Sequence, residues 1–75
     1  MIKIYTQQNC PECEQAKIFF DTQQIPFEVF DITHNEKLKK YVMFELGVYH
    51  TPVIVIQDII IPGFQKERIT SLLCK

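Results

Sequence analysis

Hydrophobic and polar positions follow two different periods along the first third of the chain. Apolar residues at Ile2, Ile4 and Tyr5 are typical of a short β-strand, and the polar residues 6–9 predict a loop after it. From Pro11 to Gln24 the spacing becomes helical. The predicted core face of this helix repeats at i, i+3, i+4 and i+7 and consists of Ala16, Phe19, Phe20 and Gln23.

The next segment returns to a strand pattern. The residue before a proline is pushed out of the α-helical region, so Ile25 and Pro26 end the first helix. Residues 27–32 are rich in aromatic and β-branched side chains and predict a second strand. Strand, helix and strand in this order form a βαβ unit, which pairs its two strands in parallel.

A second helix and a hairpin are predicted in the middle of the chain. Asn35 is a suitable N-cap, and Gly47 is a suitable stop for a helix in this region. Its helical repeat consists of Leu38, Tyr41, Val42, Glu45 and Leu46. The apolar runs 53–56 and 59–61, separated by two residues, predict an antiparallel hairpin of buried strands.

The chain is predicted to close with a third helix. Pro62 and Gly63 are expected to break the second hairpin strand. The apolar positions of the closing helix are Phe64, Ile69, Leu72 and Leu73. The order β-α-β-α-β-β-α places the chain in the α/β class, and we expect residues 1–75 to form one domain.

Composition and charge exclude several classes of function. A formal net charge of −1 provides no basic field for nucleic acid and no polybasic patch for a membrane. No apolar run reaches about 18 residues, and the start lacks the apolar core of a signal peptide. We therefore expect a cytoplasmic protein whose partners are proteins or small thiols.

The segment Cys10-Pro11-Glu12-Cys13 carries the candidate chemistry. Cysteines separated by two residues are close enough to form a disulfide when they lie one helical turn apart. Cys10 is expected at the helix N-cap and Pro11 at the first helical position, where a missing N–H is tolerated. Free backbone N–H groups and the helix dipole then favour a Cys10 thiolate, the reactive nucleophile. Cys13 is expected to be buried and to resolve a mixed disulfide formed at Cys10.

Other interpretations of these residues stay open at this stage. A zinc site needs four ligands, and the sequence has no second CxxC and no H-x₃₋₅-H motif. A binding module that holds a metal or an iron–sulfur cluster is the alternative from another class, and it would show visible absorbance and dimerise with metal. His50 is either a solvated loop residue or a modulator of Cys10, and Cys74 is interpreted as a spare thiol.

Four short motifs together resemble the glutaredoxin family of the thioredoxin-like superfamily. They are Tyr5-Thr6, Cys10-Pro11-Glu12-Cys13, Thr51-Pro52-Val53 and Gly63-Phe64. Within the family, the chain is similar to NrdH-type redoxins and small dithiol glutaredoxins. The resemblance implies a thioredoxin-like fold, in which a four-stranded mixed sheet has helices on both faces. It also implies thiol–disulfide oxidoreductase activity on protein disulfides, with ribonucleotide reductase as a candidate client.

The resemblance assigns further roles along the chain. It implies that Cys10 and Cys13 form the redox disulfide and that the Thr51–Pro52 bond is cis and faces it. The implied substrate-binding residues are Tyr5, Pro11, Glu12, Thr51, Pro52, Gly63 and Phe64. It implies no bound cofactor and no metal, with electrons supplied by thioredoxin reductase and NADPH or by glutathione. We expect a monomer.

Departures from the family pattern bear on the choice of reductant. Glutathione-using glutaredoxins usually have Lys or Arg where this chain has Gln7, so a weak glutathione site is expected. The residues around Gly63-Phe64 match NrdH-type redoxins only in part. Glu12 places a carboxylate between the two thiols, and like charge opposes ionisation of Cys10. A reduction potential of roughly −200 to −270 mV follows as a hypothesis.

Overall fold

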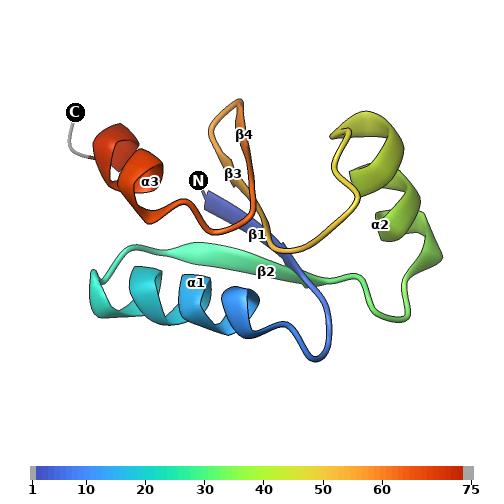
Figure 1. Ribbon diagram of the computed structural model, residues 1–75, viewed down its shortest axis with the longest axis horizontal. Helices are drawn as coiled ribbons and strands as arrows, with labels where there is room; N and C mark the ends of the chain where they lie inside the picture. The colour runs from blue at the N-terminus through green and yellow to red at the C-terminus, as the bar shows by residue number, and fades with distance from the viewer. Residues whose placement is uncertain (1, 74–75) are drawn as a thin grey trace.

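The computed structural model describes residues 2–73 and contains a sheet with helices on both of its faces (Figure 1). Its elements follow the predicted order, with a π-helical segment directly after the second helix. They are β1 (Ile2–Thr6), α1 (Pro11–Thr22), β2 (Phe27–Asp31), α2 (Glu36–Lys40), η1 (Tyr41–Glu45), β3 (Val53–Ile56), β4 (Ile59–Pro62) and α3 (Lys66–Leu73).

The four strands form one mixed sheet in the order β2-β1-β3-β4. β1 pairs in parallel with β2, and Ile4 lies opposite Val29. β3 is antiparallel to β1 and β4, with Ile54 opposite both Ile4 and Ile61. The predicted βαβ unit, hairpin and mixed four-stranded sheet are therefore confirmed, and β2 and β4 are the edge strands.

Two separate hydrophobic clusters hold the layers together, because alternate side chains of a strand point to opposite faces. The first joins the sheet to α1 and α3 and contains Ile2, Ile4, Ala16, Phe20, Ile54, Ile56, Ile61 and Ile69. The second joins the opposite face to η1 and the segment after it and contains Tyr5, Ile32, Val42, Val48 and Val53. Both central strands contribute to both clusters, so the end of β1 that leads to Cys10 is fixed from two sides.

Four details differ from the sequence prediction. The closing helix α3 begins at Lys66, so Phe64 lies in the turn before it and not in the helix. Gln23 is exposed rather than part of the core face, because α1 ends at Thr22 and Gln23 is its C-cap. β4 continues through Pro62, which lies opposite Val53. A proline is tolerated there because β4 is an edge strand and needs no N–H on its open side. The same open edge leaves Ile59 36% exposed, so the second hairpin strand is not fully buried.

The second helix begins as predicted and changes its winding before it ends. The Asn35 side chain accepts a hydrogen bond from the Leu38 N–H at 3.1 Å, which confirms the N-cap. In η1 the Leu46 N–H donates to the Tyr41 carbonyl at 3.2 Å, five residues back. Gly47 has a φ of +72°, as expected of the residue that stops a helix. None of the helices in residues 2–73 has the length and apolar character needed to span a membrane.

Candidate active site

Cys10 lies at the junction between the loop after β1 and the first turn of α1. Its backbone is extended, with a φ of −120°, and Pro11 is the first helical residue. The Cys10 sulfur accepts a hydrogen bond from the Cys13 N–H at 3.2 Å. The predicted N-cap geometry is therefore confirmed, and a donor of the free helix end points at the sulfur.

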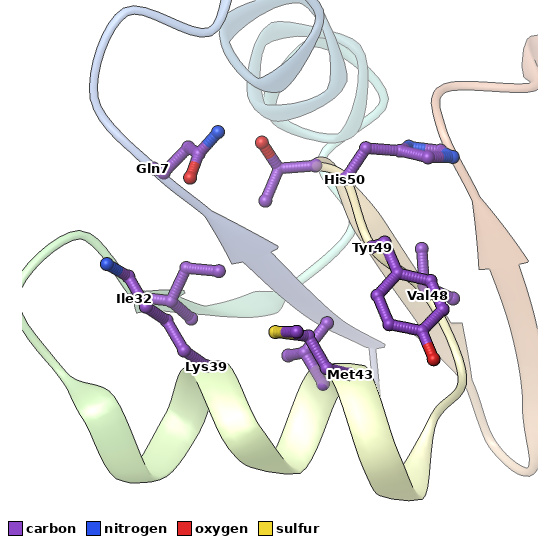
Figure 2. A pocket seen from close by; sticks show the side chains of 9 residues that line it. Gln7, Ile32, Lys39, Met43, Val48, Tyr49 and His50 are labelled. Atoms are coloured by element: carbon purple, nitrogen blue, oxygen red, sulfur yellow. The ribbon is translucent and has the colours of Figure 1, made fainter.

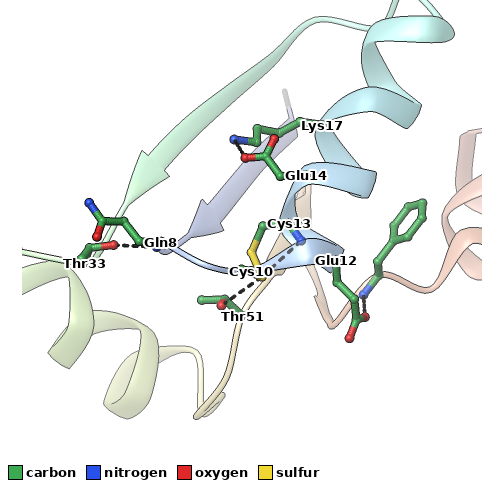
Figure 3. Close-up of a disulfide and its surroundings, with 9 residues drawn as sticks. Gln8, Cys10, Glu12, Cys13, Glu14, Lys17, Thr33 and Thr51 are labelled. Carbon is green, nitrogen blue, oxygen red and sulfur yellow. Dashed lines mark hydrogen bonds and ion pairs between the residues drawn. A yellow bond between two sulfur atoms is a disulfide. The ribbon is translucent and has the colours of Figure 1, made fainter.

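Cys10 and Cys13 form a disulfide, and their Cα atoms are 5.2 Å apart (Figure 3). The two sulfurs differ in access, because Cys10 is half-buried whereas Cys13 is only 1% exposed. An incoming thiolate or disulfide therefore reaches Cys10 first, and Cys13 is protected by the core side of α1.

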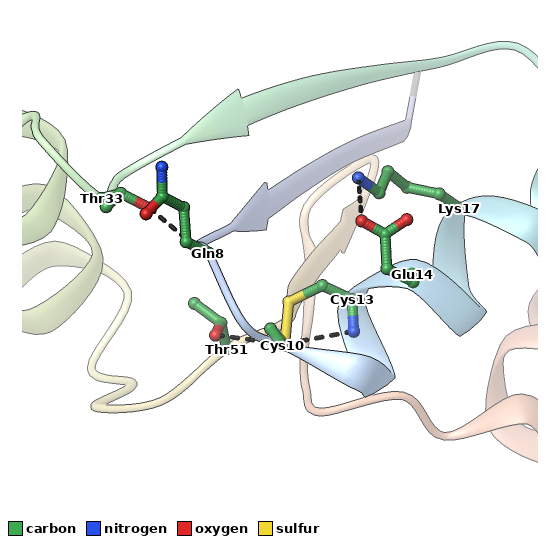
Figure 4. A network of polar contacts seen from close by, with 7 residues as sticks. All are labelled: Gln8, Cys10, Cys13, Glu14, Lys17, Thr33 and Thr51. Carbon is green, nitrogen blue, oxygen red and sulfur yellow. Dashed lines mark hydrogen bonds and ion pairs between the residues drawn. A yellow bond between two sulfur atoms is a disulfide. The ribbon is translucent and has the colours of Figure 1, made fainter.

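Thr51 approaches the same sulfur from the loop before β3. Its hydroxyl donates to the Cys10 sulfur, with 3.5 Å between Oγ1 and Sγ (Figure 4). The Thr51–Pro52 bond is cis, the form that the resemblance implies, and Pro52 is buried. Sequence reasoning assigned only backbone contacts to Thr51 and missed the hydroxyl. The residue type could have indicated this contact, because threonine differs from the similarly shaped valine by a hydroxyl group that can donate a hydrogen bond.

The turn after β4 closes the site from the other side. The Gly63 N–H donates to the Pro52 carbonyl at 2.7 Å, and a φ of +77° at Gly63 favours glycine at this turn. The next N–H, that of Phe64, donates to Glu12 Oε1 at 3.4 Å. The Phe64 ring lies 5.7 Å from the ring of Phe19 on α1. The structure thus brings Glu12, Pro52, Gly63 and Phe64 together beside the disulfide.

Tyr5 has a different environment from the other predicted site residues. It is 5% exposed and belongs to the cluster under η1. Its ring lies 5.2 Å from Phe30 and 6.0 Å from Tyr41. Burial raises the pKa of Tyr5, and the neighbouring Tyr41 raises it further. The structure therefore places Tyr5 in the core and not along the surface of the disulfide.

A network of short hydrogen bonds fixes the loop that leads to Cys10 (Figure 4). The Gln8 N–H donates to the Thr33 hydroxyl at 2.8 Å, and the Thr33 N–H donates to Asp31 at 2.8 Å. Hydrogen bonding from the Thr33 side chain, and then from the Thr33 N–H, lowers the pKa of the exposed Asp31. The sequence alone did not single out Gln8 or Thr33. They are 25 residues apart, and the parallel pairing of β1 and β2 brings them together.

An open groove of about 370 Å³ runs past the disulfide. Its lining comes from the loop after β1, the loop before β3 and the first turn of α1, and consists of Gln7, Asn9, Cys10, Pro11, Glu12, His50 and Thr51. A smaller pocket of about 120 Å³ adjoins it and shares Gln7, His50 and Thr51. Figure 2 shows Lys39, Met43 and Tyr49 at the far side of this pocket. Exposed His50 therefore lines the same groove as Cys10.

Among residues 2–73, no three His, Cys, Asp or Glu side chains gather into a group that would hold an ion. Cys74, which sequence analysis interpreted as a spare thiol, lies outside the described residues.

Comparison with known proteins assigns the chain to a family. The model of the Glutaredoxin family matches residues 2–61, and the chain belongs to that family of thiol–disulfide oxidoreductases. The solved structure of the thioredoxin-like protein BC3987 is 30% identical and superposes with a TM-score of 0.89, covering 96% of this chain and 99% of that one. The thioredoxin-like fold implied by the four motifs is confirmed.

Two relatives show which members of the family this chain is similar to. The glutaredoxin-like protein NrdH of Lactococcus lactis subsp. lactis is 26% identical over 96% of this chain and 99% of its own length. The N-acetyl-S-hydroxy-L-cysteine reductase of Bacillus subtilis is 31% identical over 95% of this chain and 72% of its own. This chain is therefore a glutaredoxin with NrdH-like redoxins among its relatives.

We expect Thr51→Val to raise the pKa of the Cys10 thiol by about 0.5–1 unit, because a hydrogen bond to a charged sulfur stabilises the thiolate. Ultraviolet absorbance of the thiolate, titrated against pH in the reduced protein, measures the change. Thr70→Val is the control, since Thr70 is exposed on α3. Equal pKa values in both variants would show that the Thr51 hydroxyl does not act on the thiolate.

Proposed function

We propose that the chain reduces protein disulfides through Cys10 as nucleophile and Cys13 as resolving thiol. The Cys10 thiolate attacks one sulfur of the substrate, forms a mixed disulfide and releases the other sulfur as a thiolate that takes up a proton. The Cys13 thiolate then attacks Cys10, which releases the second substrate thiol and closes the Cys10–Cys13 disulfide. Two electrons pass from the protein to the substrate.

The observation that carries this proposal is the asymmetry between the two sulfurs. Cys10 is half-buried and receives a helix N–H and the Thr51 hydroxyl, whereas Cys13 is 1% exposed. Donors aimed at a partly exposed sulfur favour a nucleophilic thiolate there. Cys13, one helical turn away, is close enough to attack the Cys10 sulfur once that sulfur is part of a mixed disulfide.

Thioredoxin reductase with NADPH is the reductant that we propose, and ribonucleotide reductase is the proposed client. The similarity to NrdH-type redoxins supports both. The neutral Gln7 in the groove beside Cys10 also supports the first, because it offers no cation to a glutathione carboxylate. One experiment tests the proposed reductant and the proposed client together. It measures whether purified ribonucleotide reductase turns over continuously when supplied with this chain, thioredoxin reductase and NADPH.

We expect thioredoxin reductase to reduce the disulfide faster than glutathione does. NADPH consumption, coupled either to thioredoxin reductase or to glutathione and its reductase, measures the two rates on one substrate. Gln7→Lys is the informative variant, because it adds a cation to the groove and should increase only the glutathione rate. A wild-type protein that turns over equally fast or faster with glutathione would contradict the expected preference.

A second candidate function is the reduction of small sulfenylated cysteine derivatives. It is favoured by the similarity to the N-acetyl-S-hydroxy-L-cysteine reductase of Bacillus subtilis. In this reaction Cys10 attacks the S–OH sulfur and releases hydroxide, which becomes water, and Cys13 then releases the free thiol. Turnover of N-acetyl-S-hydroxycysteine, compared with that of a protein disulfide under the same reductase, distinguishes the two functions.

A further inference from the structure

Glu12 has a fixed place beside the disulfide. It is the second residue of α1, between the two cysteines, and its Oε1 accepts the Phe64 N–H at 3.4 Å (Figure 3). The turn that supplies this N–H is itself held by the hydrogen bond from Gly63 to Pro52, at 2.7 Å. The long contact to Phe64 therefore holds an exposed carboxylate against a turn that is tied to the core.

The carboxylate also determines the charge of the groove. Among the described residues that line the groove at Cys10, Glu12 is the one acidic side chain, and none is a lysine or an arginine. No lysine or arginine in residues 2–73 lies within ion-pair distance of Glu12, whereas Glu14 pairs with Lys17 at 3.0 Å. Glu12 thus brings a negative charge with no lysine or arginine partner to the rim of the groove, where its carboxylate lies against the Phe64 N–H.

We infer that Glu12 is a specificity-determining residue that selects substrates and reductants by the charge next to their reacting sulfur. A thiol that attacks Cys10 has its neighbouring group in the groove, within a few bonds of the sulfur. A cation there is attracted by Glu12 and an anion is repelled. This inference rests on the proposed function. It predicts sulfurs flanked by lysine, arginine or an amine as good partners, and sulfurs flanked by carboxylates as poor ones.

The reaction that tests the inference is reduction of the Cys10–Cys13 disulfide by small thiols. The first thiolate attacks the Cys10 sulfur, and Cys13 leaves as a thiolate and takes up a proton. A second thiolate then attacks the small thiol's sulfur in the mixed disulfide, releasing a small disulfide and the Cys10 thiolate. Two thiols supply the two electrons, so no client protein or reductase is needed.

Cysteamine, 2-mercaptoethanol and 3-mercaptopropionate are matched probes, because they carry a positive, a neutral and a negative group at a similar distance from sulfur. Rates are expressed per thiolate, and the ratio of the cysteamine rate to the mercaptopropionate rate is the readout. A merely structural role of Glu12 would alter the reduction potential or the pKa of Cys10. Such a change affects the rates of both thiols alike and therefore cancels in the ratio.

We expect Glu12→Gln to lower the wild-type ratio by roughly fivefold. Glu14→Gln is the control, since it makes the same change in net charge on the same helix but lies outside the groove lining. The wild-type ratio should approach that of Glu12→Gln at about 1 M salt, where the screening length falls to about 3 Å.

Two outcomes would overturn different parts of the argument. Equal ratios in wild type and Glu12→Gln, or equal decreases in both variants, would overturn selection by Glu12 while the disulfide is still reduced. A disulfide that none of the three thiols reduces would overturn the proposed redox function itself, and selection by Glu12 with it.

Discussion

Cys10→Ser abolishes disulfide reduction, and Cys13→Ser accumulates a stable mixed disulfide between Cys10 and the substrate. The first variant lacks the sulfur that the groove exposes and that accepts hydrogen bonds from Cys13 and Thr51. The second keeps the nucleophile but lacks the thiol that resolves the adduct. We expect loss of more than about 10³-fold in protein-disulfide turnover for Cys10→Ser, since no other group at the site replaces a nucleophile.

Mass spectrometry of the reduced variants after incubation with a small disulfide, such as cystamine, detects the adduct. Both variants are made on a Cys74→Ser background, because a third cysteine would otherwise form adducts of its own. The doubly substituted Cys10→Ser, Cys13→Ser protein is the control and should carry none. An adduct on Cys10→Ser and none on Cys13→Ser would reverse the two roles and contradict the argument from burial.

Periodicity predicted the elements well where a segment buries one regular face. Residues 27–31 and 53–56 form strands as expected, and the helix after Pro11 begins where the proline indicates. The misplaced details lie at boundaries and edges. Pro62 extends β4 and Ile59 is partly exposed because β4 has a neighbour on one side only, and sheet order cannot be read from a single strand. The π-helical turn in η1 likewise has no sequence signal of its own.

The candidate site was predictable to the extent that its residues are close in sequence. The placement of Cys10 and Pro11 followed from helix capping, whereas Thr51 is 41 residues from Cys10 and Phe64 is 52 from Glu12. Motif resemblance brought these residues to one site. It did not indicate that the Thr51 hydroxyl donates to the Cys10 sulfur or that Glu12 contacts the turn. Those contacts depend on side-chain direction, which the spacing of motifs does not specify.

The stability of the site depends on the core under α1, and Phe20→Ala should cost about 3–5 kcal/mol of unfolding free energy. Phe20 is fully buried and contacts the rings of Phe19 and Phe27, at centroid distances of 5.3 and 5.9 Å. Its removal leaves a cavity between α1 and the sheet. A 75-residue domain has a total stability of roughly 4–11 kcal/mol, so much of it would be lost.

Urea denaturation followed by circular dichroism measures this change, and Phe44→Ala is the matched control. Phe44 is 71% exposed on η1, so the same truncation should change stability by less than about 0.5 kcal/mol. Because α1 carries Cys10 at its N-terminus, Phe20→Ala should also lose reductase activity at the temperature where it unfolds and keep it below. Similar unfolding midpoints for the two variants would mean that the α1 face does not hold the active-site helix on the sheet.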